Sequence, residues 1–240
     1  MIVQLFPTCL VNEFRPDAGM AVVRVLERVG CEVAVPDGLT CCGQPAFNAG
    51  FHDEARQVAR HTIDVLAATD GPIVVPSGSC CDMLVHQNEE LFRDDAARAA
   101  TARRVASRCR EFSQFVVERG GVACGSLPSR VAYHPSCHLQ RGLQVQRQPL
   151  QLIGGVPGAD ALSFDEQNEC CGFGGLFSIK NPEISAAMMD RKLNAIEASG
   201  ADRLVSCDLG CLLHLEGGLR RRRAAITVQH LAEFLDEAAR

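Results

Sequence analysis

The sequence predicts an α/β protein made of two pseudo-symmetric βα repeats, each with a largely parallel sheet. Short apolar runs alternate along the chain with segments whose apolar residues recur at helical spacing, a pattern typical of α/β folds. Three cysteine signals occur twice, in the same order and about 130 residues apart, which indicates an internal duplication. We therefore expect a first cysteine-rich repeat at residues 1–94, a helical linker at 95–129 and a second cysteine-rich repeat at 130–240.

In the first repeat, three apolar runs have the length of strands, and helical patterns separate them. The strands are expected at residues 1–6, 31–35 and 72–76. Asp17 can cap the first helix and Gly30 can end it. Ala55, Ile63 and Leu66 lie at helical spacing and predict a second helix with one apolar face. Each strand is thus followed by a loop that carries one of the cysteine signals.

The second repeat follows the same plan. Its strands are expected at residues 130–133, 162–164, 203–206 and 226–228. A helix is expected to begin at Asn181-Pro182-Glu183, with a capping residue and a first-turn proline in favoured places, and to run to Gly200. A final helix completes the chain, and the linker is expected to be one helix from Asp95 to Arg119. Most cysteine loops then lie at the carboxyl ends of strands, where open α/β sheets bind ligands.

Composition narrows the class of protein. The 240 residues are 47% hydrophobic and 22% charged, enough to bury a core, and the net charge of -5 does not favour a nucleic-acid partner. No apolar run approaches the roughly 18 residues of a membrane span, so we expect no direct membrane insertion. The first residues lack a secretory pattern, so we expect a cytoplasmic protein. Because cytoplasmic thiols stay reduced, the thirteen cysteines point to metal binding or catalysis rather than to disulfides.

Eight of the cysteines belong to the duplicated pattern of a single cysteine, a Cys-Cys-Gly and a later cysteine. They are Cys9, Cys41, Cys42 and Cys80 in the first repeat, and Cys137, Cys170, Cys171 and Cys211 in the second. Four thiolates are the number that a 4Fe-4S cube needs, and adjacent cysteines can reach different irons of one cluster. A single zinc ion is more often held by cysteines spaced two to four residues apart. The pattern therefore favours one or two iron–sulfur clusters per chain.

Other interpretations of the cysteines remain open from the residues alone. The eight can be small buried apolar side chains or ligands of a structural zinc. Cys81 and Cys207 adjoin or nearly adjoin the pattern, so each is a possible extra ligand, a resolving thiol or a bystander. Cys31, Cys109 and Cys124 have no counterpart in the repeat, and we expect them to be ordinary core residues.

Three histidines and one glycine-rich run lie near the cysteine motifs in the sequence. Imidazole can bind iron or carry protons, but we expect His134, His138 and His214 to be ordinary hydrogen-bonded histidines. The glycine-rich run at residues 172–175 lacks the GxGxxG spacing of a dinucleotide loop. No other segment resembles a flavin or nicotinamide site.

Several motifs resemble those of the cysteine-rich CCG-domain iron–sulfur family, over essentially the whole chain. They are Pro7-Thr8-Cys9, Cys41-Cys42-Gly43-Gln44-Pro45, Gly78-Ser79-Cys80, Cys170-Cys171-Gly172-Phe173-Gly174-Gly175 and Gly210-Cys211-Leu212. The resemblance is closest to the lactate-utilisation members, and more distant to the iron–sulfur protein of glycolate oxidase and to the cysteine-rich protein of heterodisulfide reductase. It implies a non-autonomous oxidoreductase subunit, an electron-transfer component of an L-lactate oxidation system that converts lactate to pyruvate. It also implies companion iron–sulfur and accessory proteins as partners.

One departure from the family pattern matters. The heterodisulfide reductase relatives end each motif with Cys-x-x-Cys, whereas Ser77 stands three residues before Cys80 and Asp208 three before Cys211. We therefore expect ordinary four-thiolate clusters. The alternatives are a component of a glycolate oxidase, a heterodisulfide-reductase-like thiol catalyst, and a non-enzymatic metal-binding scaffold or redox sensor.

Overall fold

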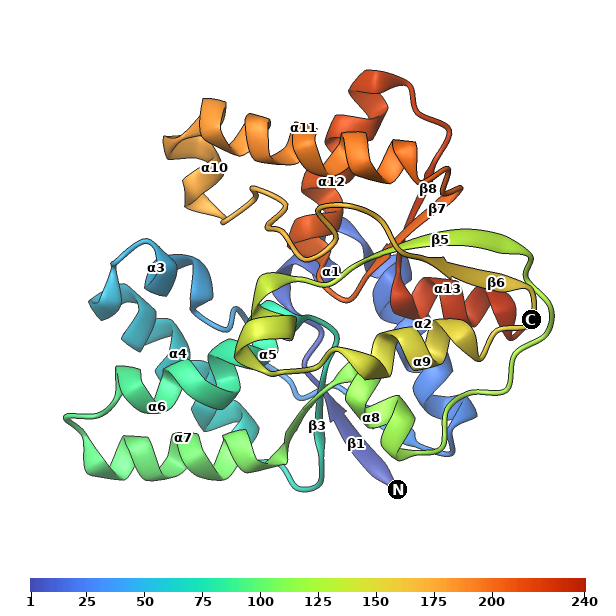
Figure 1. Cartoon of the computed structure of the whole chain (residues 1–240). Helices are drawn as coiled ribbons and strands as arrows, with labels where there is room; N and C mark the ends of the chain where they lie inside the picture. Colours follow the sequence, from blue (N-terminus) through green and yellow to red (C-terminus); the bar gives the residue numbers. More distant parts are fainter.

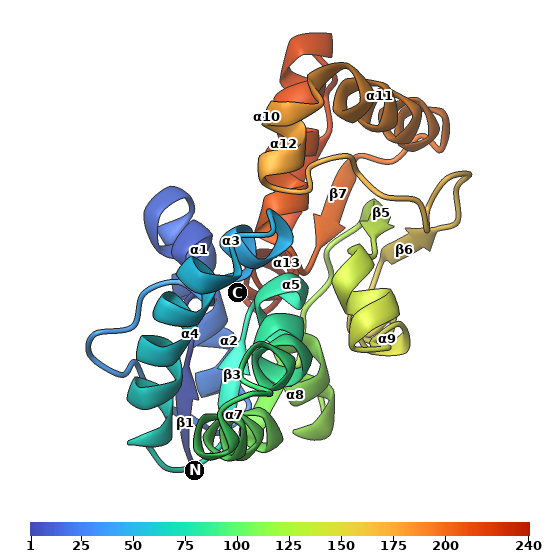
Figure 2. The ribbon, with the colours of Figure 1, turned by 90° about the vertical axis from the view of Figure 1, so that its left-hand side faces the viewer.

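The computed structural model describes residues 1–240, which form two α/β halves (Figures 1 and 2). The elements of the first half are β1 (Ile2–Leu5), α1 (Cys9–Phe14), α2 (Pro16–Arg28), β2 (Glu32–Ala34), α3 (Gln44–Asn48), α4 (His52–Ala67), β3 (Ile73–Val75), α5 (Gly78–Asp82), a π-helical turn (Met83–Gln87), α6 (Asn88–Leu91), α7 (Ala96–Arg108), β4 (Cys109–Glu111) and α8 (Phe112–Glu118).

The second half repeats this order with fewer helices between its strands. Its elements are β5 (Ser129–His134), a π-helical turn (His138–Gly142), α9 (Arg147–Gly154), β6 (Ala159–Leu162), α10 (Leu176–Lys180), α11 (Pro182–Ala198), β7 (Arg203–Ser206), α12 (Leu209–Arg222), β8 (Thr227–His230) and α13 (Leu231–Ala238). Most of the expected strands and helices are present within a few residues of their predicted bounds. The helix expected from Asp17 begins at Pro16, and no side chain caps it.

Each half contains one four-stranded sheet, and all of the strand pairs are parallel. The strand orders are β2-β1-β3-β4 and β6-β5-β7-β8, so the two sheets share one topology. The central strands are buried and apolar, as expected of parallel sheets covered by helices on both faces. The predicted fold class, two pseudo-symmetric βα repeats, is confirmed. Figure 2 shows β1 and β3 of the first sheet below β5, β6 and β7 of the second.

The expected continuous helix from Asp95 to Arg119 is wrong. Helix α7 ends at Arg108, and residues Cys109–Glu111 form β4, which pairs with β3 as the fourth strand of the first sheet. The buried Glu111 carboxylate then accepts hydrogen bonds from the backbone N–H groups of Ser113 and Gln114 and caps α8. Pairing with a neighbouring strand and this cap outweigh the local helical pattern. The segment between the repeats therefore contributes to the first sheet.

The two halves share one hydrophobic core. Val3 and Leu5 of β1 belong to the same buried cluster as Val131 and Tyr133 of β5 and Leu235 of α13. Helix α13, which follows the last strand of the second half, packs against α2 of the first half (Figure 1). Because these contacts cross between the halves, the halves hold each other in one arrangement. None of the helices combines the length and the apolar character that a membrane crossing requires.

We predict that Asp236→Asn lowers the free energy of unfolding at pH 7 by about 2–3 kcal/mol, because charged hydrogen bonds between α13 and α2 are lost. The buried Asp236 carboxylate contacts Arg24 at 2.8 Å and also pairs with Arg28 and Arg240. Burial alone would raise the pKa of Asp236, but the three guanidinium groups outweigh it and hold the pKa well below its usual range. The stabilisation is therefore present above about pH 4 and is lost as the pH falls.

Urea unfolding of the wild type and of Asp236→Asn at pH 7 and pH 3 measures this loss of stability. The difference in the free energy of unfolding between the two proteins should be smaller at pH 3. Asp94→Asn is the matched control, because Asp94 is 89% exposed and its nearest cation lies 3.9 Å away. A wild-type stability at pH 7 in the Asp236 variant would contradict the prediction.

Candidate metal centre

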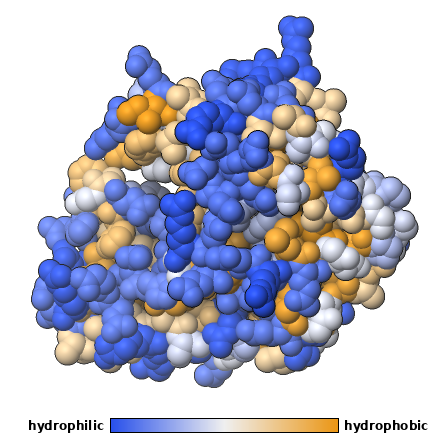
Figure 3. Space-filling model, in the orientation of Figure 1, coloured by the Kyte–Doolittle hydropathy of each residue, from blue (hydrophilic) through white to orange (hydrophobic).

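The eight repeated cysteines all line one cavity of about 500 Å³ between the two halves. The sequence predicts a pair of sites, one in each repeat, but it does not predict that the two sets face a common space. Pro45 and Asn48 of α3 border the cavity on one side, and Leu176 and Ile179 of α10 border it on the other. Figure 3 shows a hollow between these two regions, with hydrophobic residues on both sides of it. The walls are therefore largely apolar around a group of thiols.

The first cysteine set comes from the three loops expected from the sequence. Cys9 begins α1 directly after β1, Cys41 and Cys42 lie between β2 and α3, and Cys80 lies in α5 after β3. The sulfur atoms form two close contacts, at 3.8 Å between Cys9 and Cys41 and at 3.3 Å between Cys42 and Cys80. The strand order β2-β1-β3 brings the three loops to one edge of the sheet.

The second set has the same construction. Cys137 follows β5, Cys170 and Cys171 follow β6, and Cys211 lies in the first turn of α12 after β7. The thiol of Cys137 interacts most strongly with that of Cys170, and the thiol of Cys171 interacts with those of Cys170 and Cys211. The pairing of thiols is therefore the same in both halves, as the duplication predicts.

Backbone N–H groups point at the sulfur atoms of both Cys-Cys pairs. Gly43 donates to the sulfur of Cys41 at 3.5 Å, and Gly172 donates to the sulfur of Cys170 at 3.4 Å. The two glycines have φ angles of 91° and 90°, in the left-handed region that glycine adopts without a steric penalty. The glycine after each pair therefore turns the chain so that its own amide faces the thiol.

Hydrogen bonds between thiols separate their pKa values within each set. The pKa of Cys41 is lowered because the thiols of Cys42 and Cys9 donate to its thiolate. The pKa of Cys170 is lowered in the same way by Cys137 and Cys171. Each set thus contains one thiol that is readily deprotonated, and the thiolate is the form of cysteine that binds metal.

The remaining five cysteines do not line the cavity. Cys81 and Cys207 are buried behind it, and the Tyr133 hydroxyl lies 3.8 Å from the Cys207 sulfur. Burial raises the pKa of both thiols well above the usual value. Cys31 and Cys109 lie in the apolar core, and Cys124 is partly buried. Cys81 and Cys207 are therefore not positioned as a fifth cavity thiol in either half.

Ser77 and Asp208, the residues that depart from the family pattern, contact each other across the junction of the halves. Ser77 Oγ donates to Asp208 Oδ2 at 3.2 Å, and Ser79 N–H donates to the same oxygen at 2.9 Å. Asp208 Oδ1 accepts from Gly210 N–H at 3.1 Å and caps α12. Ser77 and Asp208 also line the cavity. Hydrogen bonds that join the two halves thus replace the additional thiols.

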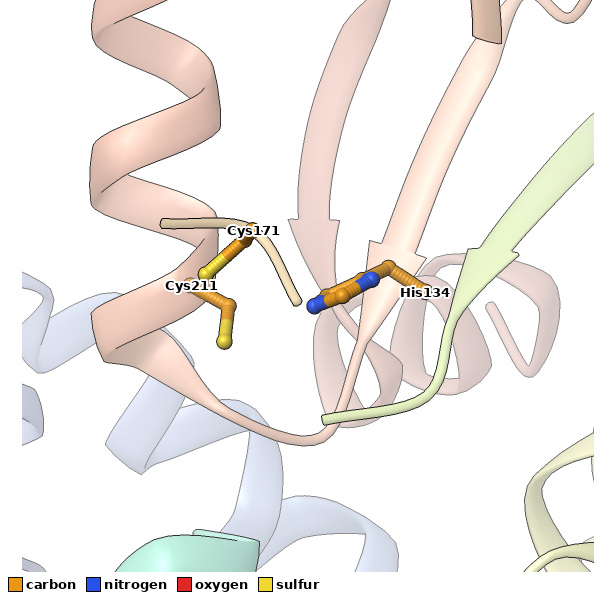
Figure 4. Close-up of side chains that lie close together, drawn as sticks. All are labelled: His134, Cys171 and Cys211. Atoms are coloured by element: carbon orange, nitrogen blue, oxygen red, sulfur yellow. The ribbon is translucent and has the colours of Figure 1, made fainter. Parts of the chain in front are cut away.

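The three histidines near the cysteine sets differ in their hydrogen bonding. His138 and His214 are hydrogen-bonded as expected, His138 Nδ1 to Asp82 at 2.6 Å and His214 Nε2 to Ser185 at 3.4 Å. The expectation for His134 is wrong, because both of its ring nitrogens are buried without a partner. Its imidazole faces the sulfur atoms of Cys171 and Cys211, and the ligand atoms of the three lie within 4.8 Å of one another (Figure 4).

Burial lowers the pKa of His134 to about 3, so its imidazole is neutral at physiological pH. A buried polar group without a hydrogen bond costs about 1–3 kcal/mol, and such a cost often marks a place for a ligand. The sequence signal that could have identified His134 is its position three residues before Cys137, where Phe6 stands before Cys9. The donor atoms of the site, eight thiols with amide N–H groups in apolar surroundings, suit a metal or an iron–sulfur group.

Comparison with known proteins agrees with this class of site. The cysteine-rich domain named CCG matches residues 3–85 and 131–216, that is, both repeats. The chain therefore belongs to the CCG cysteine-rich domain family.

Within that family the chain is similar to lactate utilization protein A. It is 42% identical to the protein of that name from Shouchella clausii, over 98% of this chain and 99% of the relative. It is 41% identical to the one from Halalkalibacterium halodurans, over 100% and 98%. A hypothetical protein from Helicobacter pylori shares the fold at 11% identity with a TM-score of 0.73. That match covers 99% of this chain and 48% of the other, so the chain spans about half of that structure.

We predict that Gly172→Ala destabilises the protein by about 1–3 kcal/mol, the usual cost of a strained backbone position. A Cβ atom at residue 172 would lie 2.5 Å from the backbone oxygen of Ser185, where the positive φ is also unfavourable for alanine. The Cys170-Cys171 loop would have to move away from α11, and metal binding by the second set should weaken. Thermal unfolding and metal titration measure the two effects.

Gly217→Ala is the control, because nothing lies within 4 Å of a Cβ atom built there and the residue lies within α12. A melting temperature of the Gly172 variant equal to that of the control would refute the prediction.

Proposed function

We propose that the protein is a cytoplasmic iron–sulfur component that transfers electrons in an L-lactate oxidation system. The observation that carries the proposal is the convergence of both cysteine sets on one apolar cavity. The similarity to lactate utilization protein A over nearly the full length supports lactate as the substrate of the system. Each set would hold one 4Fe-4S cluster, with Cys9, Cys41, Cys42 and Cys80 in the first site and Cys137, Cys170, Cys171 and Cys211 in the second.

Iron–sulfur clusters supply one-electron chemistry, and the residues of this chain would hold and tune them. The thiolates bind the irons, while the amides of Gly43 and Gly172 donate hydrogen bonds toward sulfur. Hydrogen bonds of this kind stabilise negative charge and raise a reduction potential. Apolar residues such as Phe173 and the buried Leu209 line the cavity beside the thiols. Because both sets line one cavity, an electron could pass between them over a short distance.

The proposed role requires partners. Removing a hydride from a 2-hydroxy acid needs a flavin or a nicotinamide, and the sequence contains no motif for either. We therefore propose that companion iron–sulfur and accessory proteins complete the reaction and that this chain is a subunit without independent dehydrogenase activity. A heterodisulfide-reductase-like role is less well supported, because Ser77 and Asp208 contribute oxygen atoms to the cavity and Cys81 and Cys207 lie outside it.

The first test is the iron and acid-labile sulfide content of protein purified or reconstituted without oxygen, together with its electron paramagnetic resonance spectrum. About four or eight irons per chain with matching sulfide are expected for one or two clusters. Zinc, or no metal after reconstitution, would overturn the proposal and favour a scaffold or a thiol-based sensor. With the companion proteins added, L-lactate should reduce the clusters, whereas reduction by glycolate alone would reassign the substrate.

We predict that Cys42→Ser and Cys171→Ser each remove roughly half of the iron of a two-cluster protein, because each variant lacks one of the four thiolates of one site. Both should also stop lactate-dependent electron flow. Cys124→Ser is the matched control, since Cys124 is partly buried outside the cavity and its thiol hydrogen-bonds to the Val122 carbonyl at 3.6 Å. Normal iron content in either pair variant would contradict the ligand assignment.

A further inference from the structure

The duplication allows the surroundings of the two cysteine sets to be compared position by position. Helices α4 and α11 cover corresponding sides of the two sites, and their buried residues match at one constant offset. These residues are Ala55, Ala59, Thr62, Ile63 and Leu66 in α4, and Ser185, Met189, Lys192, Leu193 and Ile196 in α11. Four of the five pairs are small or apolar in both halves. The pair of Thr62 and Lys192 differs in charge.

Thr62 is neutral and hydrogen-bonds through its hydroxyl to the Cys41 carbonyl at 2.8 Å. Lys192 is 1% exposed, and its ammonium donates to the carbonyls of Glu166 and Gln167, in the loop before Cys170. No carboxylate forms an ion pair with Lys192. Burying an ammonium group without an ion pair costs free energy, and a negative charge nearby reduces that cost.

The thiolates of the second cysteine set can supply this negative charge. Burial lowers the pKa of Lys192, while the thiols of Cys171, Cys137 and Cys211, followed by the Glu169 carboxylate, act to raise it. Lys192 lies in α11 between Met189 and Leu193, which belong to the same buried cluster as Cys171 and Cys211, so its side chain is buried beside the second cysteine set. The first set has no such group at the corresponding position, which Thr62 occupies.

A second difference lies at the ends of the central strands. Phe6 stands three residues before Cys9, and His134 stands three residues before Cys137; both are fully buried. The neutral His134 imidazole has an N–H group without an acceptor, and it faces Cys171 and Cys211. The first half offers an apolar ring at this place, whereas the second offers a hydrogen-bond donor.

We propose that the second cysteine set forms the site of higher reduction potential and receives electrons from the first. A buried cation and an N–H donor both stabilise the negative charge that one-electron reduction adds, and the low dielectric of the interior strengthens their effect. In the transfer, the first site is oxidised by one electron and the second is reduced by one, with no proton or atom exchanged. Asp208 accepts hydrogen bonds from Ser79 N–H, beside Cys80, and from Gly210 N–H, beside Cys211, so its negative charge lies near both sites. This inference rests on the proposed function.

The potentials of the two sites can be measured separately. Replacing Cys41 and Cys42 by alanine leaves the second site, and replacing Cys170 and Cys171 by alanine leaves the first. A potentiometric titration followed by electron paramagnetic resonance should give the higher potential for the chain that retains the second site. Equal potentials, or the reverse order, would overturn this inference while leaving the proposed function intact. Failure of the wild-type chain to bind iron would overturn the proposed function and this inference with it.

Lys192→Met tests whether the Lys192 ammonium raises the reduction potential of the second site. It should lower the equilibrium constant for reduction of the second site at least tenfold, a shift of about 59 mV for one electron. Thr62→Val is the matched control in the other half and should leave the potential of the second site unchanged. Should the Lys192 variant not fold, His134→Phe, which introduces the residue of the first half, should lower the same potential. An unchanged second-site potential in an iron-loaded Lys192→Met or His134→Phe protein would refute the assigned role of that residue.

Discussion

The hydrogen bonds that Asp208 accepts from Ser77 and Ser79 hold the two halves together at the wall of the cysteine cavity. The backbone N–H of Gly78 adds a bond to the Cys207 carbonyl across the same junction. A Cβ atom at Gly78 would lie 2.7 Å from Leu139, so the turn can approach the other half only as glycine. Because Cys80 and Cys211 lie in the first turns of the helices that these bonds connect, the separation of the two cysteine sets depends on this junction.

The duplicated backbone imposes the same donor geometry twice. Parallel strands bring the loops after their carboxyl ends to one edge, so the order of the strands places three cysteine loops together in each half. The glycines after the Cys-Cys pairs then direct amide hydrogens to sulfur in both halves. Substitutions of buried side chains can give the two sites different properties while the backbone stays the same. Lys192 and His134 are changes of this kind, since they alter charge and hydrogen bonding where Thr62 and Phe6 stand in the other half.

The candidate site was only partly predictable. The eight cysteines could be identified because a duplicated spacing does not depend on knowing the fold, and the structure places all eight on one cavity. His134 was not singled out, because its position three residues before Cys137 does not show whether its ring has a hydrogen-bond partner. Its ring lacks a partner because the neighbours that the fold brings to it are the side chains of Cys171 and Cys211. Cys81 likewise needed the structure, since it follows Cys80 on α5 and adjacent residues on a helix point in different directions. Cys207 lies in the turn between β7 and α12, and only the structure shows that it is buried outside the cavity.

The sequence by itself determined the α/β class, the two repeats and the cysteine sets, because hydrophobic periodicity and spacing are local properties of the chain. Tertiary structure alone decided that residues Cys109–Glu111 complete the first sheet, since strand pairing with β3 competes with the local preference for helix. It alone also decided that both sets face one cavity. That arrangement follows from long-range packing, above all from α13 against α2 and from the shared core of β1 and β5. Contacts between residues far apart in the chain leave no periodic trace from which a sequence could predict them.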